Sequence, residues 1–243
     1  MASHAFYSHT TAAHLWSLPL PRALQTEAPL HVSVPRARRA PGGRLVVGHA
    51  VSVSPSDITV LRGHRVTSLE RTVLDLAPLL GDEALLGAID NALWRRRDVF
   101  ERATPGSLRE AALRCTTRVG RARILSLVDI GTDRADSPPE SAFRLRFIRA
   151  GFPEVEANSP IYDPLGNFIA MPDLQFRAHR LAFDYEGDVH RTDKRQWRKD
   201  LRRVPLLQDN DWHHTRLSGD DLADPGECLA RTRRLLLDRG WRP

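Results

Sequence analysis

Three carboxylates with the spacing of a metal site lie between residues 171 and 190 of this 243-residue chain. Asp173 is expected on one short strand. Asp184 and Glu186 stand two apart on the next strand, so they project from the same face. Three acids on a mostly apolar hairpin repel one another and lose hydration, which is costly unless a cation joins them. Oxygen ligands without a nearby cysteine favour Mg²⁺ or Mn²⁺; an exposed hairpin with acids on its solvent side is the alternative.

A basic helix is expected directly after this hairpin, over residues 192–204, with Pro205 ending or kinking it. Such a helix beside an acidic metal site suits a polyanion held by metal, Lys and Arg together, although a solvated basic face is the alternative. The adjacent His213 and His214 are expected on a strand, where neighbours point to opposite faces, so we do not expect them to bind one metal ion together. The candidate DNA-binding residues are Lys194, Arg195, Arg198, Lys199, Arg202 and Arg216.

The order of landmarks over residues 137–222 is typical of one enzyme superfamily. The landmarks are Pro138-Pro139-Glu140-Ser141, Pro172-Asp173, Asp184-Tyr185-Glu186-Gly187, His190, Asp200, Asp211-Trp212, Arg216 and Asp220-Asp221-Leu222. In this order the segment resembles the very-short-patch-repair-like domain of the PD-(D/E)XK nucleases. Relatives usually read Glu-x-Asp-Gly where this chain reads Asp-Tyr-Glu-Gly, so the reach of both acids differs by one methylene.

The resemblance implies a restriction-endonuclease-like fold and a role for each landmark residue. It implies that Glu140, Asp173 and Asp184 bind the metal and that Glu186 stands where the superfamily often has a lysine. It places His190 to act on the attacking water or the leaving group. The implied activity is metal-dependent hydrolysis of a DNA phosphodiester with Mg²⁺ or Mn²⁺.

Residues 8–16, 30–35 and 66–77 are similar to the abortive-infection (AbiEi-like) antitoxin family. Members of that family generally begin with a helix-turn-helix region upstream of the Ser-His-Thr segment. This chain starts almost at that segment, so the module is expected to be absent. The similarity implies the alternative function: a non-catalytic DNA-binding or antitoxin-type regulator in a toxin–antitoxin or phage-defence system, with a toxin or other protein as partner.

Composition is compatible with both functions. The chain carries a net charge of +6 and 41% hydrophobic residues, and its pI is near 10.1, which suits a nucleic-acid partner. Its two cysteines, Cys115 and Cys228, have no metal-binding spacing and are interpreted as buried thiols in a reducing cytosol. No secretory segment and no apolar run near eighteen residues is present, so we expect a cytoplasmic protein without a membrane span.

The chain is predicted to be an α/β protein of two domains. Residues 1–132 should form a mixed α+β region, and residues 133–243 a restriction-endonuclease-like mixed sheet flanked by helices, with the linker near residues 130–138. In the first domain, strands are expected at 30–34, 45–47 and 58–61, and helices at 10–18, 67–80, 83–96, 107–114 and 120–128. In the second domain, strands are expected at 154–157, 168–176, 181–186 and 212–217, helices at 138–150, 192–204 and 219–238, and a hairpin turn at 163–167.

Overall fold

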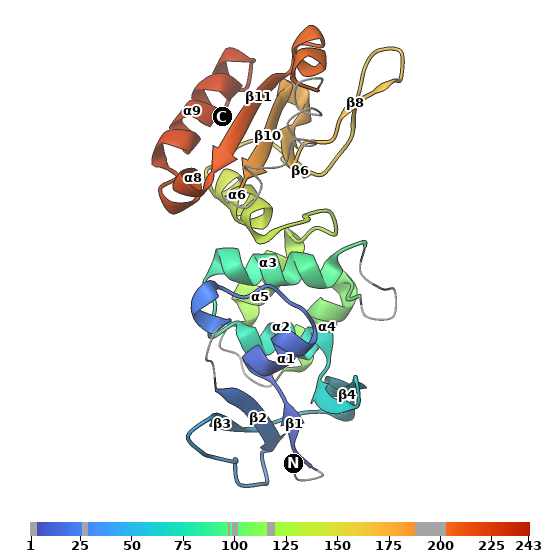
Figure 1. The fold of residues 1–243 in the computed structure, drawn as a ribbon, viewed down its shortest axis with the longest axis vertical. Helices are drawn as coiled ribbons and strands as arrows, with labels where there is room; N and C mark the ends of the chain where they lie inside the picture. Colours follow the sequence, from blue (N-terminus) through green and yellow to red (C-terminus); the bar gives the residue numbers. More distant parts are fainter. Residues whose placement is uncertain (1–3, 26–28, 97, 99–101, 116–119, 188–202) are drawn as a thin grey trace. The chain divides into compact units, whose positions relative to one another are not determined.

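The computed structural model describes residues 4–25, 29–96, 98, 102–115, 120–187 and 203–243 (Figure 1). The chain divides into two compact units, one ending at Asp133 and the other beginning at Arg134, one residue beyond the boundary expected from the sequence. Both units combine helices with mixed sheets, which confirms the α/β class. None of the described helices is both long enough and apolar enough to cross a membrane.

The N-terminal unit is built on a five-stranded sheet with the order β3-β2-β1-β5-β4. Strand β2 runs parallel to β3 and antiparallel to β1, and β5 runs parallel to β1 and antiparallel to β4. Strand β1 has only two residues and was not predicted, because so short a segment shows no alternation. The strands are β1 (Phe6–Tyr7), β2 (Leu30–Pro35), β3 (Val46–Val51), β4 (Ile58–Leu61) and β5 (His64–Thr67).

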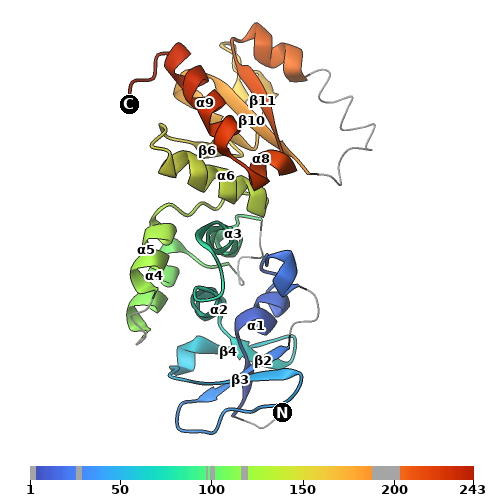
Figure 2. The same cartoon turned by 90° about the vertical axis from the view of Figure 1, so that its left-hand side faces the viewer.

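Helices pack on this sheet and on one another. Figure 2 shows α2 and α3 nearly end-on, beside α4 and α5. Helix α2 is shorter than the helix predicted over 67–80: the side chain of Ser68 caps its first turn, and the backbone turns after Ala77. The helices are α1 (His9–Leu15), α2 (Leu69–Leu76), α3 (Asp82–Leu93), α4 (Pro105–Arg114) and α5 (Arg121–Asp129).

The connection between the parallel strands β2 and β3 folds back onto β3. A β-carbon on Gly48 would lie 1.6 Å from the carbonyl oxygen of Pro41, so only glycine admits this close approach. Gly42 and Gly43, further along the same connection, have open space around them. The connection therefore passes close to β3 at Pro41, whereas Gly42 and Gly43 have room for a side chain, and the carbonyl of Gly43 accepts a hydrogen bond from the N–H of Val46 at 3.1 Å.

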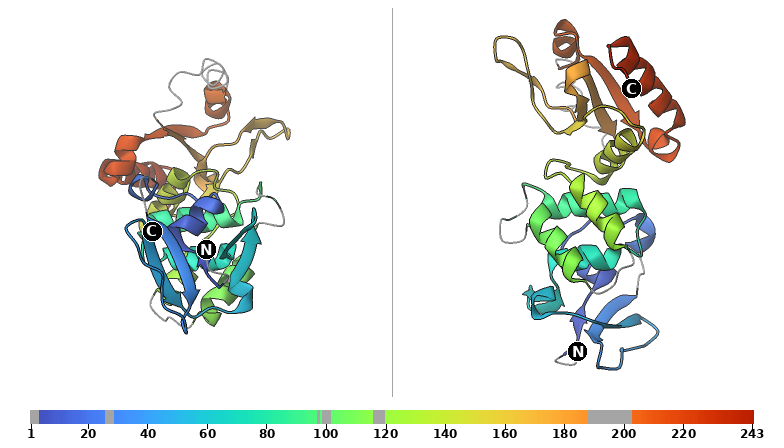
Figure 3. Two further views of the ribbon diagram at one scale, coloured as in Figure 1. Left: turned by 60° about the horizontal axis from the view of Figure 1, so that its bottom comes forward. Right: turned by 180° about the vertical axis from the view of Figure 1, so that it is seen from behind.

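The C-terminal unit is built on a four-stranded sheet with the order β11-β10-β9-β6. Strand β10 runs parallel to β11 and antiparallel to β9, and β6 is antiparallel to β9. The hairpin of β7 and β8 turns at residues 163–167, as predicted, and projects from the sheet (Figure 3). The strands are β6 (Glu156–Ala157), β7 (Ile161–Tyr162), β8 (Phe168–Ala170), β9 (Leu174–Phe176), β10 (Leu181–Glu186) and β11 (His213–Ser218).

The two faces of this sheet carry different cores. Leu181 and Phe183 of β10 pack with Phe143 and Phe147 of α6 (Pro138–Arg149) and with α9 (Gly226–Asp238). The intervening Ala182 faces a second cluster with Leu207 and Trp212. The period of two along β10 therefore places Asp184 and Glu186 on the face of Ala182, away from α6. A short helix, α8 (Gly219–Ala223), directly follows β11.

Several predicted elements are corrected. The strand expected over 168–176 is interrupted around Pro172, which cannot donate to a sheet. The helix expected over 219–238 is two helices, divided at Asp224 and Pro225. Residues 203–209 are helical, so helical structure continues past Pro205, while residues 192–202 of the predicted helix lie outside the described residues. Cys228 is a buried thiol as expected, whereas Cys115 is partly exposed.

Candidate functional site

Asp173 and Asp184 meet at the end of the β9–β10 ladder. The last paired residues are Leu174 and Phe183, so the next step places the two acids opposite each other. The backbone N–H of Asp173 donates to Asp184 Oδ1 at 3.3 Å, and that of Tyr185 donates to Asp173 Oδ2 at 2.7 Å. Asp173 lies in the bend just before β9 rather than on the predicted strand. The structure thus brings together two of the three predicted metal ligands.

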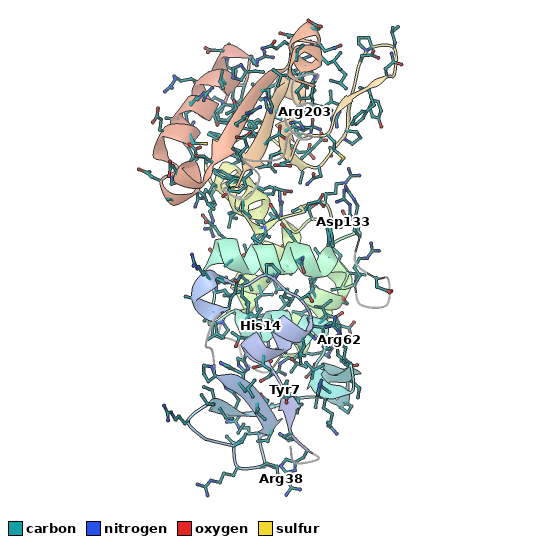
Figure 4. The ribbon with its side chains drawn as sticks, viewed as in Figure 1. Tyr7, His14, Arg38, Arg62, Asp133 and Arg203 are labelled. Carbon is teal, nitrogen blue, oxygen red and sulfur yellow. The ribbon has the colours of Figure 1, made fainter. Side chains whose placement is uncertain are left out.

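Basic side chains surround the Asp184 carboxylate. The register of β10 and β11 places His214 beside Ala182 and Arg216 beside Asp184. His214 Nε2 lies 2.5 Å from Asp184 Oδ2, and Arg203, labelled in Figure 4, forms an ion pair with the same oxygen. The three side chains are mostly buried, with exposed fractions of 16% for Asp184, 8% for His214 and 21% for Arg203. Asp184 is therefore held by two groups from other elements.

A second ion pair lies at the exposed rim of this site. Arg216 Nη1 contacts Glu186 Oε1 at 2.9 Å, and about half of each side chain is exposed. Glu186 lies two residues after Asp184 on the same face, as the strand period predicted. Arg216, predicted to contact DNA, thus stands next to the acids and remains accessible to solvent.

Glu140 lies at the first turn of α6 and is buried. Its carboxylate accepts hydrogen bonds from the backbone N–H of Asp136 at 2.8 Å, from Ser137 Oγ at 2.6 Å and from Asn158 Nδ2 at 2.6 Å. Burial raises the pKa of Glu140 above its ordinary range, and these three donors oppose that rise. The carboxylate therefore has a structural role as part of the cap of α6.

The surroundings of Asp173 disfavour the negative charge of its carboxylate. Burial raises the pKa of Asp173 to about 6, and the charge of Glu140 contributes in the same direction. The hydrogen bond from Tyr185 and the charge of Arg203 act in the opposite direction. Burial in turn lowers the pKa of Arg203. A further cation between Asp173 and Asp184 would relieve this cost.

The acids fit a two-carboxylate ion site better than the predicted three-carboxylate site. Among the described residues, Glu140, Asp173 and Asp184 do not bring three carboxylate oxygens within 4.8 Å of one another in this arrangement. Mg²⁺ commonly uses one or two carboxylates and completes its shell with waters and substrate phosphates, so Asp173 and Asp184 suffice. The guanidinium of Arg203 is itself a cation and forms an ion pair with the carboxylate of Asp184.

Other predicted site residues lie outside the described part of the chain, within residues 188–202: His190, Lys194, Arg195, Arg198, Lys199 and Arg202. Sequence reasoning did not place Arg203 or His214 in the site. The alternation along β11 does separate His213 from His214: His213 lies near Arg231 and Arg239, while His214 faces Asp184. The missing information was the parallel register of β10 and β11, which the sequence does not encode locally.

Comparison with known proteins gives two relatives and no family. The chain is 26% identical over 241 residues to an uncharacterized protein of Mycobacterium tuberculosis strain CDC 1551, covering 97% of this chain and 83% of the relative. An uncharacterized protein of strain H37Rv matches with the same identity and coverage. No known family model matches the chain. No solved structure matches it either.

Proposed function

We propose that the C-terminal unit is a metal-dependent DNA endonuclease of the very-short-patch-repair-like type, acting in the cytoplasm. The observation that carries the proposal is the facing pair Asp173 and Asp184, with Arg203 and Arg216 on the same side of the sheet. Paired acids with adjoining arginines suit a phosphodiester, because the acids can hold a cation while the arginines neutralise phosphate oxygens.

The chain's own residues divide the work of the proposed reaction. Asp173 and Asp184 would hold Mg²⁺ or Mn²⁺, which, when bound, lowers the pKa of a water and polarises a phosphate oxygen. Arg216 would exchange its exposed contact with Glu186 for a phosphate oxygen and so orient the strand. Arg203 would move from Asp184 toward the phosphorane charge that develops as the water's oxygen bonds to phosphorus and the leaving oxygen departs.

His214 acts on this site through Asp184. Its ring is mostly buried and its Nε2 is bonded to Asp184 Oδ2, so it fixes the direction of that carboxylate. The proton that the leaving oxygen requires would come from solvent or from His190, which the resemblance assigns to acid–base chemistry.

The test is cleavage of supercoiled plasmid by the full chain with Mg²⁺ or Mn²⁺. Asp173→Asn, which removes the charge with little change of volume, should abolish nicking. Asp238→Asn makes the same change at an exposed position of α9 and should cleave like the wild type. Nicking that survives Asp173→Asn, or that persists in chelator, would refute the proposal.

One observation favours a second candidate, a DNA-binding regulator without catalysis. Arg203 and His214 both contact the Asp184 carboxylate, so this acid has partners without a metal ion. In that case the full chain should shift DNA on a gel both with and without chelator, and the Asp173→Asn variant should do the same. Neither protein should cleave the DNA. A toxin partner, as the antitoxin resemblance implies, belongs to this candidate.

A further inference from the structure

Three histidines far apart in the sequence gather in the N-terminal unit. His9 begins α1, His31 lies on β2 and His49 lies on the edge strand β3. The parallel register of β2 and β3 pairs His31 with Val47 and Ser33 with His49, so the two histidines lie two register positions apart, on the same face of the sheet. Among the described residues, this is the group of three possible ligands whose atoms all lie within 4.8 Å of one another.

The nitrogens are spaced almost as a metal would hold them. His31 Nδ1 and His49 Nε2 lie 3.0 Å apart. Two nitrogens about 2.0–2.1 Å from a tetrahedral zinc ion are separated by about 3.3 Å, so these two need to part only slightly. The ring of His9 stacks on that of His49 with centroids 3.9 Å apart and must tilt to turn its lone pair toward the same point.

A chain of buried hydroxyls orients His9. Its Nδ1 lies 2.9 Å from Ser8 Oγ, which lies 2.6 Å from Ser33 Oγ, and both serines are fully buried. If Nδ1–H donates to Ser8 and Ser8 donates to Ser33, the lone pair of His9 is on Nε2, available to an ion. Metal-binding histidines are commonly oriented in this way, through a bond from the other ring nitrogen.

The backbone of His9 is held in a costly conformation. Its φ of 51° lies in the left-handed region, which is uncommon for residues other than glycine, although histidine adopts it more often than most. Its N–H donates to the carboxylate of Asp75, which in turn pairs with Arg71 at 2.8 Å. Backbone strain maintained by buried partners is typical of functional positions.

The imidazoles are also in the protonation state that a metal requires. Burial, followed by the charges of His49, His31 and Arg71, lowers the pKa of His9 to about 3. Burial also lowers the pKa values of His31 and His49. These shifts favour the neutral imidazole, which is the form in which histidine binds a metal ion.

We propose that His9, His31 and His49 form a binding site for a divalent transition-metal ion, with Zn²⁺ as the expected ion. Three neutral imidazoles suit zinc, and they leave a fourth position for water or another ligand. On binding, the proton shared by His31 and His49 moves to the outer nitrogen of its ring, so that both facing nitrogens offer a lone pair. The ion would tie α1 to the sheet edge formed by β2 and β3.

The test is calorimetric titration of the metal-stripped full chain with ZnCl₂, supported by the visible absorption of Co²⁺. We expect one Zn²⁺ per chain at this site and cobalt bands typical of tetrahedral nitrogen coordination. His49→Ala, on a partly exposed edge strand, and His31→Asn should each weaken Zn²⁺ binding by more than roughly 100-fold. Ser33→Ala, which acts on His9 only through Ser8, should weaken it by roughly tenfold.

Two controls separate this site from other ligands. His14→Ala removes an exposed histidine of α1 whose Nδ1 lies 2.7 Å from the carbonyl oxygen of Thr10, and should leave binding unchanged. Asp184→Asn should also leave it unchanged, which distinguishes this site from the acidic site of the C-terminal unit. Circular dichroism establishes that each variant is folded. The proposal is overturned if the wild type does not bind Zn²⁺, if folded His49→Ala and His31→Asn bind it as tightly as His14→Ala, or if Asp184→Asn abolishes binding.

Discussion

Phe147→Ala should destabilise the C-terminal unit more than any surface substitution, because this ring joins α6 to the sheet. Phe147 is fully buried, and four aromatic rings surround it, with centroid distances of 5.3 to 6.3 Å. Burying a phenylalanine side chain removes roughly 150–250 Å² from water, which is worth about 4–6 kcal/mol at about 25 cal/mol per Å². Alanine retains only the β-carbon, and substitutions of this kind in cores cost about 3–5 kcal/mol. We therefore expect the free energy of unfolding of this unit to fall by about 4 kcal/mol.

The assay must report on one unit, since two units need not unfold together. Hydrogen exchange measured on peptides from β10 does so, and a loss of about 4 kcal/mol should accelerate exchange there by roughly a thousandfold. Phe168→Ala is the matched control: its ring is 60% exposed on the β7–β8 hairpin, and its effect should stay within about 0.5 kcal/mol. An acceleration of less than about tenfold in the Phe147 variant would show that the ring does not hold α6 on the sheet.

Three further predictions concern ion pairs and a helix cap. Arg71→Met should lower the free energy of unfolding of the N-terminal unit by about 3–5 kcal/mol in denaturant titrations, because it leaves the buried carboxylate of Asp75 without its arginine partner. A loss under about 1 kcal/mol would contradict this. The hydrogen bond from Arg177 lowers the pKa of Glu156 below its ordinary 4.5, so this exposed pair stabilises the fold above that pH and loses its effect as the pH falls through the lower folded value. The stability difference between wild type and Glu156→Gln, at most about 1 kcal/mol, should therefore vanish on acidification, and a difference that grows in acid would reverse the assigned sign. Ser137→Ala should reduce the thermal stability of the C-terminal unit by about 1 kcal/mol through loss of the α6 cap, whereas an unchanged melting temperature would exclude that role.

Local patterns predicted the elements that place the acids. Strand β10 was expected at 181–186 and is found there, because its apolar residues alternate and a basic turn precedes it. The same alternation placed Asp184 and Glu186 on one face, and it is this face that meets Arg203 and His214. Prolines were less reliable guides: Pro205 lies within helical residues, whereas Pro172 interrupts the expected strand.

Long-range contacts account for what the sequence could not supply. His214 reaches Asp184 only because β11 pairs with β10 in parallel, across residues far apart in the chain. His9, His31 and His49 have no metal-binding spacing, and each occurs in a segment that reads locally as an ordinary strand or helix start. Their proximity follows from the pairing of β2 with β3 and from the turn that leads β1 into α1. Neither this strand pairing nor this turn leaves a signal in the local sequence.

The connection that folds back over Gly48 also provides a place to attach a reporter. An insertion before Pro41 would disturb the close approach of this residue to β3. At that point the carbonyl of Pro41 leaves room for nothing larger than glycine at position 48. Between Gly42 and Gly43 the surroundings are open, so a short tag or a fluorophore can be accommodated there. His49 directly follows Gly48 on the same strand, so a dye in this connection would be attached to the segment that passes over β3 beside one member of the histidine cluster, and it would replace none of the three histidines.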